Sequence, residues 1–532
     1  MQIVKIPFLQ VPMFSDKDVA YAIESPKLKP FYKYPVNIES FKEVIEEKKK
    51  ENTDRETLYK VIVEQYAGLE TGEAVKQNIE KLRDKNTFTI TTAHQPSLFT
   101  GPLYYIYKII STVHLVQKLN KHYPECHFVP IFVSGGEDHD FEEANHAQIF
   151  NNRLEWTNEE SGSVGMMNTK TLLPVLESLK SILGSSDNAT EIYKIIEGAY
   201  TRHERYSDAT QDLVNALFGK YGLVAINMNH PNLKRLFIPQ MQEEILKQPS
   251  HALVEASQQS LEKVGFSAQA FARDINLFYL NDQVRERIVK EDNTYKVLNT
   301  DLEFSEAALL QELEEHPEHF SPNVVMRPLY QEIVLPNLAY IGGGGELAYW
   351  LERKSQFAHF DVKFPMLIRR NSVMWIDKGS YQKMKKLELS VEDLLLDVEE
   401  LIKVHVSRST SNELSLTEEK NRVEAAYEDM TQKAASIDPT LAKAFQAEQT
   451  RQMKSLDQLE SRLMRAEKQK HDIAINQIRS LKDKFFPGNG LQERVDNFMP
   501  LFLQKGWDFF DILLLHLDPL EKAKLLVLID DK

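Results

Sequence analysis

The chain of 532 residues contains a single cysteine, Cys126. One thiol excludes an intramolecular disulfide and any metal site built from several cysteines. Cys126 lies directly before an apolar run, which favours a structural thiol over a nucleophile.

The sequence also lacks long apolar runs and an excess of positive charge. No apolar stretch approaches the roughly 20 residues that a membrane helix needs, and the first residues do not have the layout of a signal peptide. We therefore expect a cytoplasmic protein without a membrane partner. The net charge is −15, from 64 basic and 79 acidic residues. This balance argues against a nucleic-acid partner, which normally requires a basic surface.

The stretch from Phe88 to His146 predicts a strand–helix–strand unit. Apolar runs at 88–92 and 128–133 flank a helix-length amphipathic pattern at 103–119, an order typical of two parallel strands joined by a helix. With a chain of this length, 42% hydrophobic and 27% charged residues, we predict an α/β protein of roughly three units.

Polar residues follow both predicted strands. Because ligands of open parallel sheets bind beyond the carboxyl ends of the strands, we expect the two turns to face one crevice. The first turn supplies donors and an imidazole, and the second supplies carboxylates. Taken singly, each residue is more typical of a polar turn or a helix cap. The residues are His94, Gln95, Ser97, Thr100, Gly101, Glu137, Asp138, His139 and Asp140.

Further elements are expected on either side of an inserted lobe. Residues 221–227 and 277–280 predict strands, and we expect the chain to return to the sheet at 323–335. Residues 338–350 read as a strand, four glycines and a helix beginning near Glu346. The glycines fit neither the dinucleotide fingerprint nor the P-loop, so a phosphate cradle and a flexible turn both stay open. The strand at 364–372 ends in Arg369, Arg370 and Asn371, which suit carboxylate or phosphate recognition.

Residues 383–485 are charged and helix-favouring, with an apolar stripe that includes Leu456, Leu459 and Leu463. We predict a helical hairpin that pairs with a second copy as a homodimer. The predicted division is 1–150 and 321–382 for the two parts of the core, 151–320 for the inserted lobe with a returning core strand, 383–485 for the coiled coil and 486–532 for a segment packing on the core.

Two chemical alternatives arise from the acidic turn. Asp138 and His139 suit general acid–base catalysis. If the turn were helical, His139, Glu142 or Glu143 and His146 would share one face with metal-ligand spacing, as in a metal-dependent hydrolase. The second helix that would complete such a metal site is missing.

Five strings together resemble the bacillithiol biosynthesis cysteine-adding enzyme family. They are residues 91–108 (TTAHQPSLFTGPLYYIYK), 136–143 (GEDHDFEE), 327–332 (RPLYQE), the glycines with 346–350 (ELAYW), and 485–494 (FFPGNGLQER). The family commonly has glutamine at the position of His94 and proline at that of Gly344.

The resemblance implies a Rossmann-like parallel core similar to class I aminoacyl-tRNA synthetases, with an inserted connecting lobe and a dimerising α-helical coiled coil. It implies a carbon–nitrogen ligase that joins the cysteine carboxylate to the glucosamine amine of glucosaminyl malate, the last step of bacillithiol biosynthesis. Adenylation by ATP is expected by analogy, and no metal is predicted. A dimeric nucleotide-binding scaffold without turnover is the alternative.

Combining the resemblance with the predicted sheet edge assigns roles. His94, Asp138, His139 and Asp140 are the predicted catalytic residues, the last three for the cysteine ammonium or for proton transfer. Arg369, Arg370 and Asn371 are expected to hold the malyl carboxylates. The turn at 94–101 and the glycines are expected to hold phosphate or carboxylate groups. The predicted binding residues are Gln95, Ser97, Thr100, Gly101, Glu137, Arg327, Tyr330, Gln331, Gly342, Gly343, Glu346, Arg369, Arg370 and Asn371.

Overall fold

In the computed structural model, which describes residues 1–409 and 415–531, five parallel strands form the predicted sheet. Their order is β13–β12–β2–β3–β6, and every neighbouring pair is parallel. The strands are β2 (Thr87–His94), β3 (His127–Ser134), β6 (Val224–Asn227), β12 (Asn337–Gly342) and β13 (Met366–Arg369). The expected Rossmann-like sheet is confirmed, and the carboxyl ends of all five strands share one edge.

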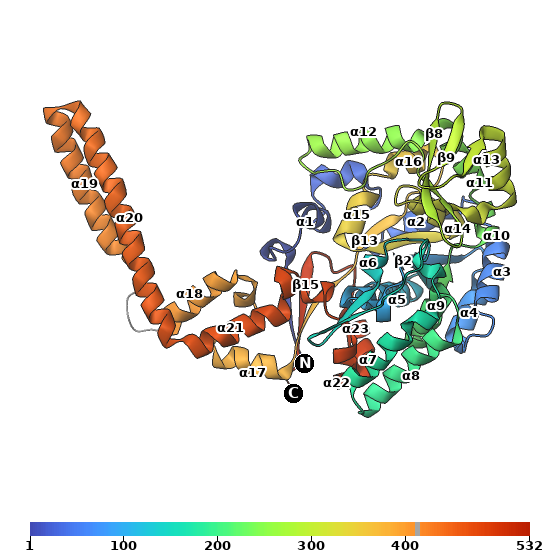
Figure 1. Ribbon diagram of the computed structural model, residues 1–532, viewed down its shortest axis with the longest axis horizontal. Coiled ribbons are helices and arrows are strands. Elements are labelled where there is room, and N and C mark those ends of the chain that lie inside the picture. The colour runs from blue at the N-terminus through green and yellow to red at the C-terminus, as the bar shows by residue number, and fades with distance from the viewer. Residues whose placement is uncertain (410–414, 532) are drawn as a thin grey trace. The chain divides into compact units, whose positions relative to one another are not determined.

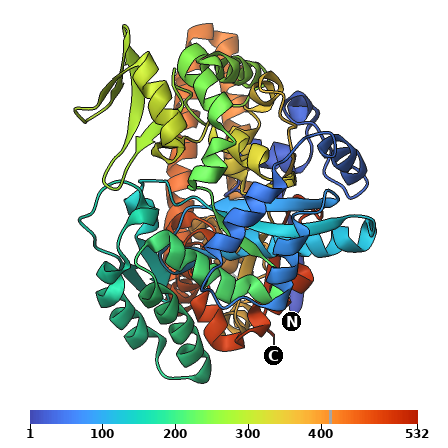
Figure 2. The same ribbon diagram turned by 90° about the vertical axis from the view of Figure 1, so that its right-hand side faces the viewer.

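Helices cover the sheet because its strands are apolar on both faces. Helix α5 connects β2 to β3 and carries mostly buried side chains. Helices α3 and α4, coloured blue in Figure 2, pack against β6. The helices nearest the sheet are α3 (Arg55–Gln65), α4 (Glu73–Lys81), α5 (Leu103–His122), α9 (Tyr206–Phe218) and α15 (Gly344–Trp350).

An antiparallel sheet forms the inserted lobe, seen at the upper left of Figure 2. Its order is β10–β9–β8–β7–β11, with β7 (Leu277–Leu280), β8 (Arg285–Glu291), β9 (Thr294–Val297), β10 (Glu303–Ser305) and β11 (Phe320–Pro322). The expected return to the parallel sheet at 323–335 is wrong. These residues form helix α14 (Arg327–Val334), which Pro328 favours as a first-turn residue. The chain re-enters the sheet at β12.

The chain divides into two compact units, residues 1–6, 374–491 and 527–532, and residues 7–373 and 492–526. The five-stranded sheet and the lobe belong to the second unit. A small sheet has the strand order β1–β15–β14, with β1 (Gln2–Pro7), β15 (Lys524–Ile529) and β14 (Ser372–Ile376). The other elements of the second unit are α1 (Asp16–Ala22), α2 (Phe41–Lys48), α6 (Phe141–Ala144), β4 (His146–Ile149), β5 (Asn152–Glu155), α7 (Leu173–Leu183), α8 (Asp187–Arg202), α10 (Pro231–Arg235), α11 (Ile238–Lys247), α12 (Pro249–Lys263), α13 (Glu306–Glu315), α16 (Lys354–His359), α22 (Met499–Lys505) and α23 (Asp508–His516).

The first unit contains the predicted helical hairpin. Helices α19 and α20 lie side by side (Figure 1), and Asp438 between them caps α20. The single long helix expected over 440–481 is divided at His471 into α20 and α21. The helices of this unit are α17 (Lys378–Lys386), α18 (Val398–Ser409), α19 (Thr417–Ile437), α20 (Pro439–Lys470) and α21 (Asp472–Phe485). Among the described residues, no helix is long and apolar enough to span a membrane.

Candidate active site

The two polar turns meet at the carboxyl edge of the sheet. His94 ends β2 and is paired in register with Ser134, the last residue of β3. The backbone N–H of Gly135 donates a hydrogen bond of 2.8 Å to the carbonyl oxygen of His94. The sheet therefore joins the start of the acidic turn directly to the start of the histidine turn.

A cavity of about 390 Å³ opens between these turns, the glycine cluster, α14 and the lobe. Ten of the predicted site residues line it: His94, Gln95, Glu137, Asp138, Arg327, Tyr330, Gln331, Gly343, Glu346 and Arg370. Eight do not: Ser97, Thr100, Gly101, His139, Asp140, Gly342, Arg369 and Asn371. Cavity residues that sequence reasoning did not select include Tyr104, Lys108, Glu143, Arg285, Tyr349 and Arg494.

The far end of the histidine turn has a structural role and does not line the cavity, so its part in binding stays a prediction. Phe99, Thr100 and Gly101 all have positive φ, an unfavourable conformation for the first two. The side-chain amide of Asn497 holds this backbone by donating to the carbonyl oxygens of Phe99 and Gly101. Ser97 and Thr100 are buried beside it.

His94 at the near end of the turn is a neutral imidazole. Burial lowers its pKa to about 4, and the ammonium of Lys108 adds to this effect. Its Nδ1 lies 2.8 Å from the carbonyl oxygen of Gln95, which can only accept, so Nδ1 carries the proton. Nε2 is 3.1 Å from the hydroxyl of Tyr104 and acts as an acceptor at the cavity wall.

Two carboxylates of the acidic turn are paired with cations. Glu137 forms an ion pair with the buried ammonium of Lys234 at 2.5 Å and accepts a hydrogen bond from Ser321 of the lobe. Asp138 lies 3.6 Å from the guanidinium of Arg285, also in the lobe. Burial would raise the pKa of Asp138, but hydrogen bonding with His139 and the charge of Arg285 outweigh it and lower the pKa to about 2. Asp138 is therefore ionised in the cavity.

His139 and Asp140 do not take the predicted catalytic positions. His139 accepts a hydrogen bond from Arg285 and packs its ring near Phe278. Asp140 is the N-cap of α6 and accepts the backbone N–H of Glu143. The helical face required by the metal-hydrolase interpretation does not form, since α6 ends at Ala144 and His146 begins β4.

Glu143 brings a carboxylate with a different protonation preference to the same wall. Desolvation raises the pKa of Glu143 above its usual value, and the charges of Asp140 and Asp138 add to the rise. A carboxylate with a raised pKa binds a proton more tightly than an ordinary one, which suits it to accept a proton from an amine. The cavity thus holds one strongly ionised carboxylate, Asp138, and one of higher proton affinity.

In the glycine cluster, Gly342 and Gly344 are closely packed, whereas Gly345 has free space beside it. A side chain at Gly344 would overlap the carboxylate of Asp18 at 2.1 Å, and one at Gly342 would contact Tyr340 at 2.9 Å. Gly345 has no neighbour within 4 Å of such a position. The N–H of Gly343 is already occupied by the carboxylate of Glu346, which weakens the case for a phosphate cradle at this helix start.

Glu346, whose side chain is 24% exposed, forms an ion pair at 2.6 Å with the buried ammonium of Lys108. Lys108 also donates to the carbonyl oxygen of Ala93, so it links the end of β2 to α15. Burial raises the pKa of Glu346, but the Lys108 ammonium outweighs this effect and lowers the pKa to about 2. Burial lowers the pKa of Lys108.

The adjacent arginines at the end of β13 have separate environments. Arg369 forms a bidentate ion pair with buried Asp18, so its predicted contact with substrate carboxylates is not supported. Asn371 bonds Ser111 and the backbone of Asp518, away from the cavity. Arg370 pairs with buried Glu493 through Nη2 at 2.9 Å. Its Nε is buried and has no hydrogen-bond partner among the described residues.

Helix α14 contributes the remaining predicted residues. Arg327 donates to the hydroxyl of Tyr349, and Tyr330 donates to the carbonyl oxygen of Met228. Gln331 is buried and donates to Glu332. Arg327 and Arg494 therefore add two more guanidinium groups to the cavity wall, beside those of Arg285 and Arg370.

Residues 1–371 match the family model described as "Bacillithiol biosynthesis BshC, N-terminal Rossmann-like domain", and residues 373–529 match the C-terminal coiled-coil domain of the same description. A relative from Flavobacterium johnsoniae, named "Putative cysteine ligase BshC", is 42% identical over 94% of this chain and 95% of its own. A relative of the same name from Christiangramia forsetii is 40% identical over 97% of both chains.

Among solved structures, a putative arginyl tRNA synthetase from Campylobacter jejuni aligns with 83% of this chain and 95% of its own. The sequence identity is 11% and the TM-score is 0.23.

Proposed function

The chain belongs to the bacillithiol biosynthesis BshC family, and we propose that it is the ligase that adds cysteine to glucosaminyl malate in the last step of bacillithiol biosynthesis. In this reaction the glucosamine amine loses a proton and forms an amide with the cysteine carboxyl group. The observation that supports it best is a single cavity that carries an anion-binding guanidinium, Arg370, and a proton-accepting carboxylate, Glu143.

Each charged group of the cavity suits one part of these substrates. Arg370, with Arg327 and Arg494, would hold the malyl carboxylates. The ionised carboxylate of Asp138 would bind the cysteine ammonium. Glu143 would take the proton of the attacking amine, and neutral His94 would hold the hydroxyl of Tyr104 at the cavity wall through Nε2.

A carboxylate oxygen must become a leaving group before an amine can displace it. We propose ATP as the co-substrate that supplies this group, by analogy with other amide-forming reactions of carboxylates. The guanidinium groups on the cavity wall are opposite in charge to its phosphates and can donate paired hydrogen bonds to them. The same arginines are proposed to hold the malyl carboxylates. ATP and glucosaminyl malate would therefore each contact only some of them.

We also propose that the protein acts in the cytoplasm as a homodimer paired through its helical hairpin. Apolar side chains of α19 and α20 that support pairing include Ile437, which is 81% exposed, Leu459 and Leu463. A second copy would remove this apolar surface from water.

Replacing Glu143 by glutamine is expected to lower the kcat of bacillithiol formation, because the amide cannot take up a proton. In the unmodified chain, the rate should fall as the pH drops through the raised pKa of Glu143, since the protonated acid is no longer a base. That acidic limb should be absent from the residual activity of the variant. The measurement is product formation from cysteine, glucosaminyl malate and ATP, followed by mass spectrometry across pH.

Glu142→Gln is the matched control, since Glu142 is an exposed neighbour that does not line the cavity. Equal losses in the two variants would contradict the role of Glu143. In the scaffold alternative, calorimetry would detect at most one of the three ligands, and the unmodified chain would release no pyrophosphate.

A further inference from the structure

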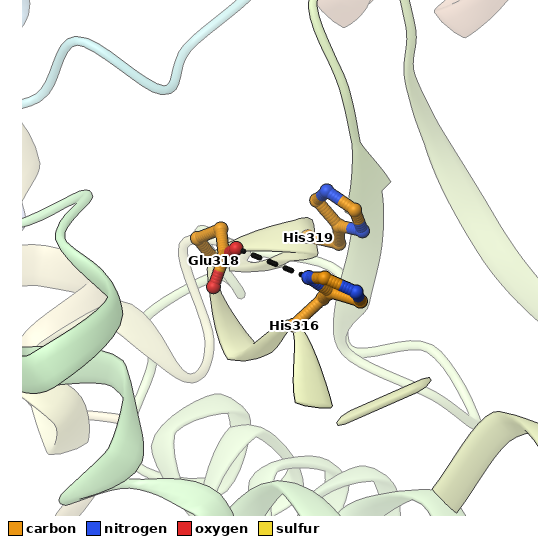
Figure 3. A group of neighbouring side chains, drawn as sticks. All are labelled: His316, Glu318 and His319. Carbon is orange, nitrogen blue, oxygen red and sulfur yellow. Dashed lines mark hydrogen bonds and ion pairs between the residues drawn. The ribbon is translucent and has the colours of Figure 1, made fainter. Parts of the chain in front are cut away.

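A group of side chains of the types that ligate metal ions lies in the lobe, outside the candidate active site. His316, Glu318 and His319 occupy the turn between α13 and β11 (Figure 3). Each can offer one ligand atom, and these atoms lie within 4.8 Å of one another. Across residues 1–409 and 415–531, no other set of three histidine, cysteine or acidic side chains meets this spacing.

The local backbone brings the three side chains together. His316 follows the last residue of α13, and Pro317–His319 form one turn of 3-10 helix. The two imidazole rings stack at 5.0 Å between centroids. Nδ1 of His316 lies 3.4 Å from the carboxylate of Glu318, the contact drawn in Figure 3.

Two further observations distinguish this turn from an ordinary polar surface. Oε2 of Glu318 is buried and has no hydrogen-bond partner among the described residues, which is unfavourable for a carboxylate oxygen. Glu312 contacts Nδ1 of His319 at 2.7 Å and itself accepts a hydrogen bond from Tyr279. Outer carboxylates of this kind orient the histidines of metal sites.

We propose that His316, Glu318 and His319 bind a divalent transition-metal ion of the zinc type. Two imidazoles and one carboxylate are a common zinc ligand set, which leaves a fourth position for water. Zinc–nitrogen distances of about 2.1 Å place neighbouring ligands about 3.4 Å apart. The ligand atoms therefore have to draw together by at most about 1.4 Å, and His316, whose side chain is 50% exposed, has room to rotate.

The ion would order the segment that supports the acidic turn. Phe320, the next residue, accepts a hydrogen bond from Lys234 through its carbonyl oxygen, and Lys234 pairs with Glu137. Ser321 donates to the other oxygen of Glu137. The metal does not touch the cavity, so its role is to stabilise the start of β11 and, through Glu137, the wall of the cavity.

Titration of the full-length, chelator-treated chain with zinc chloride tests this site. We expect one equivalent of zinc to bind by calorimetry and to raise the melting temperature. His316→Ala/His319→Ala should abolish both effects, so that zinc chloride leaves the melting temperature of this variant unchanged. Glu312→Gln should weaken zinc binding by about tenfold, as for other outer ligands.

His251→Ala is the matched control, because His251 also pairs with a carboxylate, that of Asp274 at 2.8 Å, but has no second histidine beside it. This variant should bind zinc normally. Absence of binding to the unmodified chain would overturn the proposal, and so would equal binding to the chain with both histidines replaced. If the double variant is unfolded, unchanged binding to His316→Ala alone would overturn it.

Discussion

Replacing Arg370 by methionine together with Glu493 by glutamine is expected to lower kcat/KM for bacillithiol formation by about 10²- to 10³-fold, because a buried, charge-assisted contact with a malyl carboxylate is lost. The Nη1 and Nη2 atoms of Arg370 are occupied by the carbonyl oxygen of Asn371 and by Glu493. Nε is buried at the cavity without a partner among the described residues, so it is the donor that a substrate carboxylate would use. The second substitution removes the charge that Arg370 would otherwise leave unpaired.

The neighbouring arginine supplies a matched control. Arg369 is equally buried, but its Nε and Nη2 both bind Asp18 and it does not line the cavity. Arg369→Met/Asp18→Asn should therefore retain kcat/KM while removing an ion pair of the same kind. Equal losses of activity in the two double variants would show that Arg370 acts only through the fold.

Replacing Lys108 by methionine is expected to lower the free energy of unfolding by about 3–5 kcal/mol, because it leaves the carboxylate of Glu346 without its buried partner. Burial lowers the pKa of His94 and the Lys108 ammonium lowers it further, so this pKa should rise in the variant. Denaturation with urea measures the first effect, and titration of His94 by NMR measures the second.

Two further variants separate the buried pair from ordinary charge removal. Lys76→Met removes an exposed pair with Glu73 and should cost at most about 1 kcal/mol. Lys108→Met/Glu346→Gln should recover part of the loss, since no unpaired charge remains. A loss for Lys108→Met as small as for Lys76→Met would contradict the account of the pair.

The same pair gives stability a dependence on acid pH. The pKa of Glu346 is lowered to about 2 in the folded chain, against about 4.3 for an unperturbed glutamate. Its contribution to stability is therefore present above pH 4.3 and is lost as the pH falls toward 2.

The sheet could be predicted from the sequence because buried parallel strands are continuous apolar runs and their turns carry local signals. Strands β2 and β3 and helix α5 formed where the pattern placed them. Residues 327–334 were predicted as part of a strand because of their apolar run, but they form helix α14. The prediction overlooked Pro328 as a residue that favours a helix start.

Site residues could be predicted only where the local sequence fixes their position. Arg369 and Arg370 are adjacent in sequence, and neighbours in an extended chain point to opposite sides. The sequence could not tell which one faces the cavity, because the partner of Arg369 is Asp18, some 350 residues earlier. Arg285 reaches the cavity from the lobe, and that approach is equally invisible in the chain order.

Two other cavity residues, Lys108 and Glu143, differ in how clearly the sequence indicates them. Lys108 is a charged residue inside the apolar pattern of α5, and such a lysine is rarely buried without a specific partner. That signal could have identified it. The sequence pointed to Glu143 only as one alternative metal ligand, because its place at the cavity depends on where α6 ends and on Asp140, which caps that helix.

The central claim is that the cavity at the carboxyl edge of the five-stranded sheet binds the substrates of ligation. A crystal structure of the full-length chain with glucosaminyl malate tests it most directly. The account predicts the ligand in this cavity, with a malyl carboxylate within hydrogen-bonding distance of Nε of Arg370 and the glucosamine amine beside Glu143. Glucosaminyl malate bound at another surface, with this cavity empty, would contradict it.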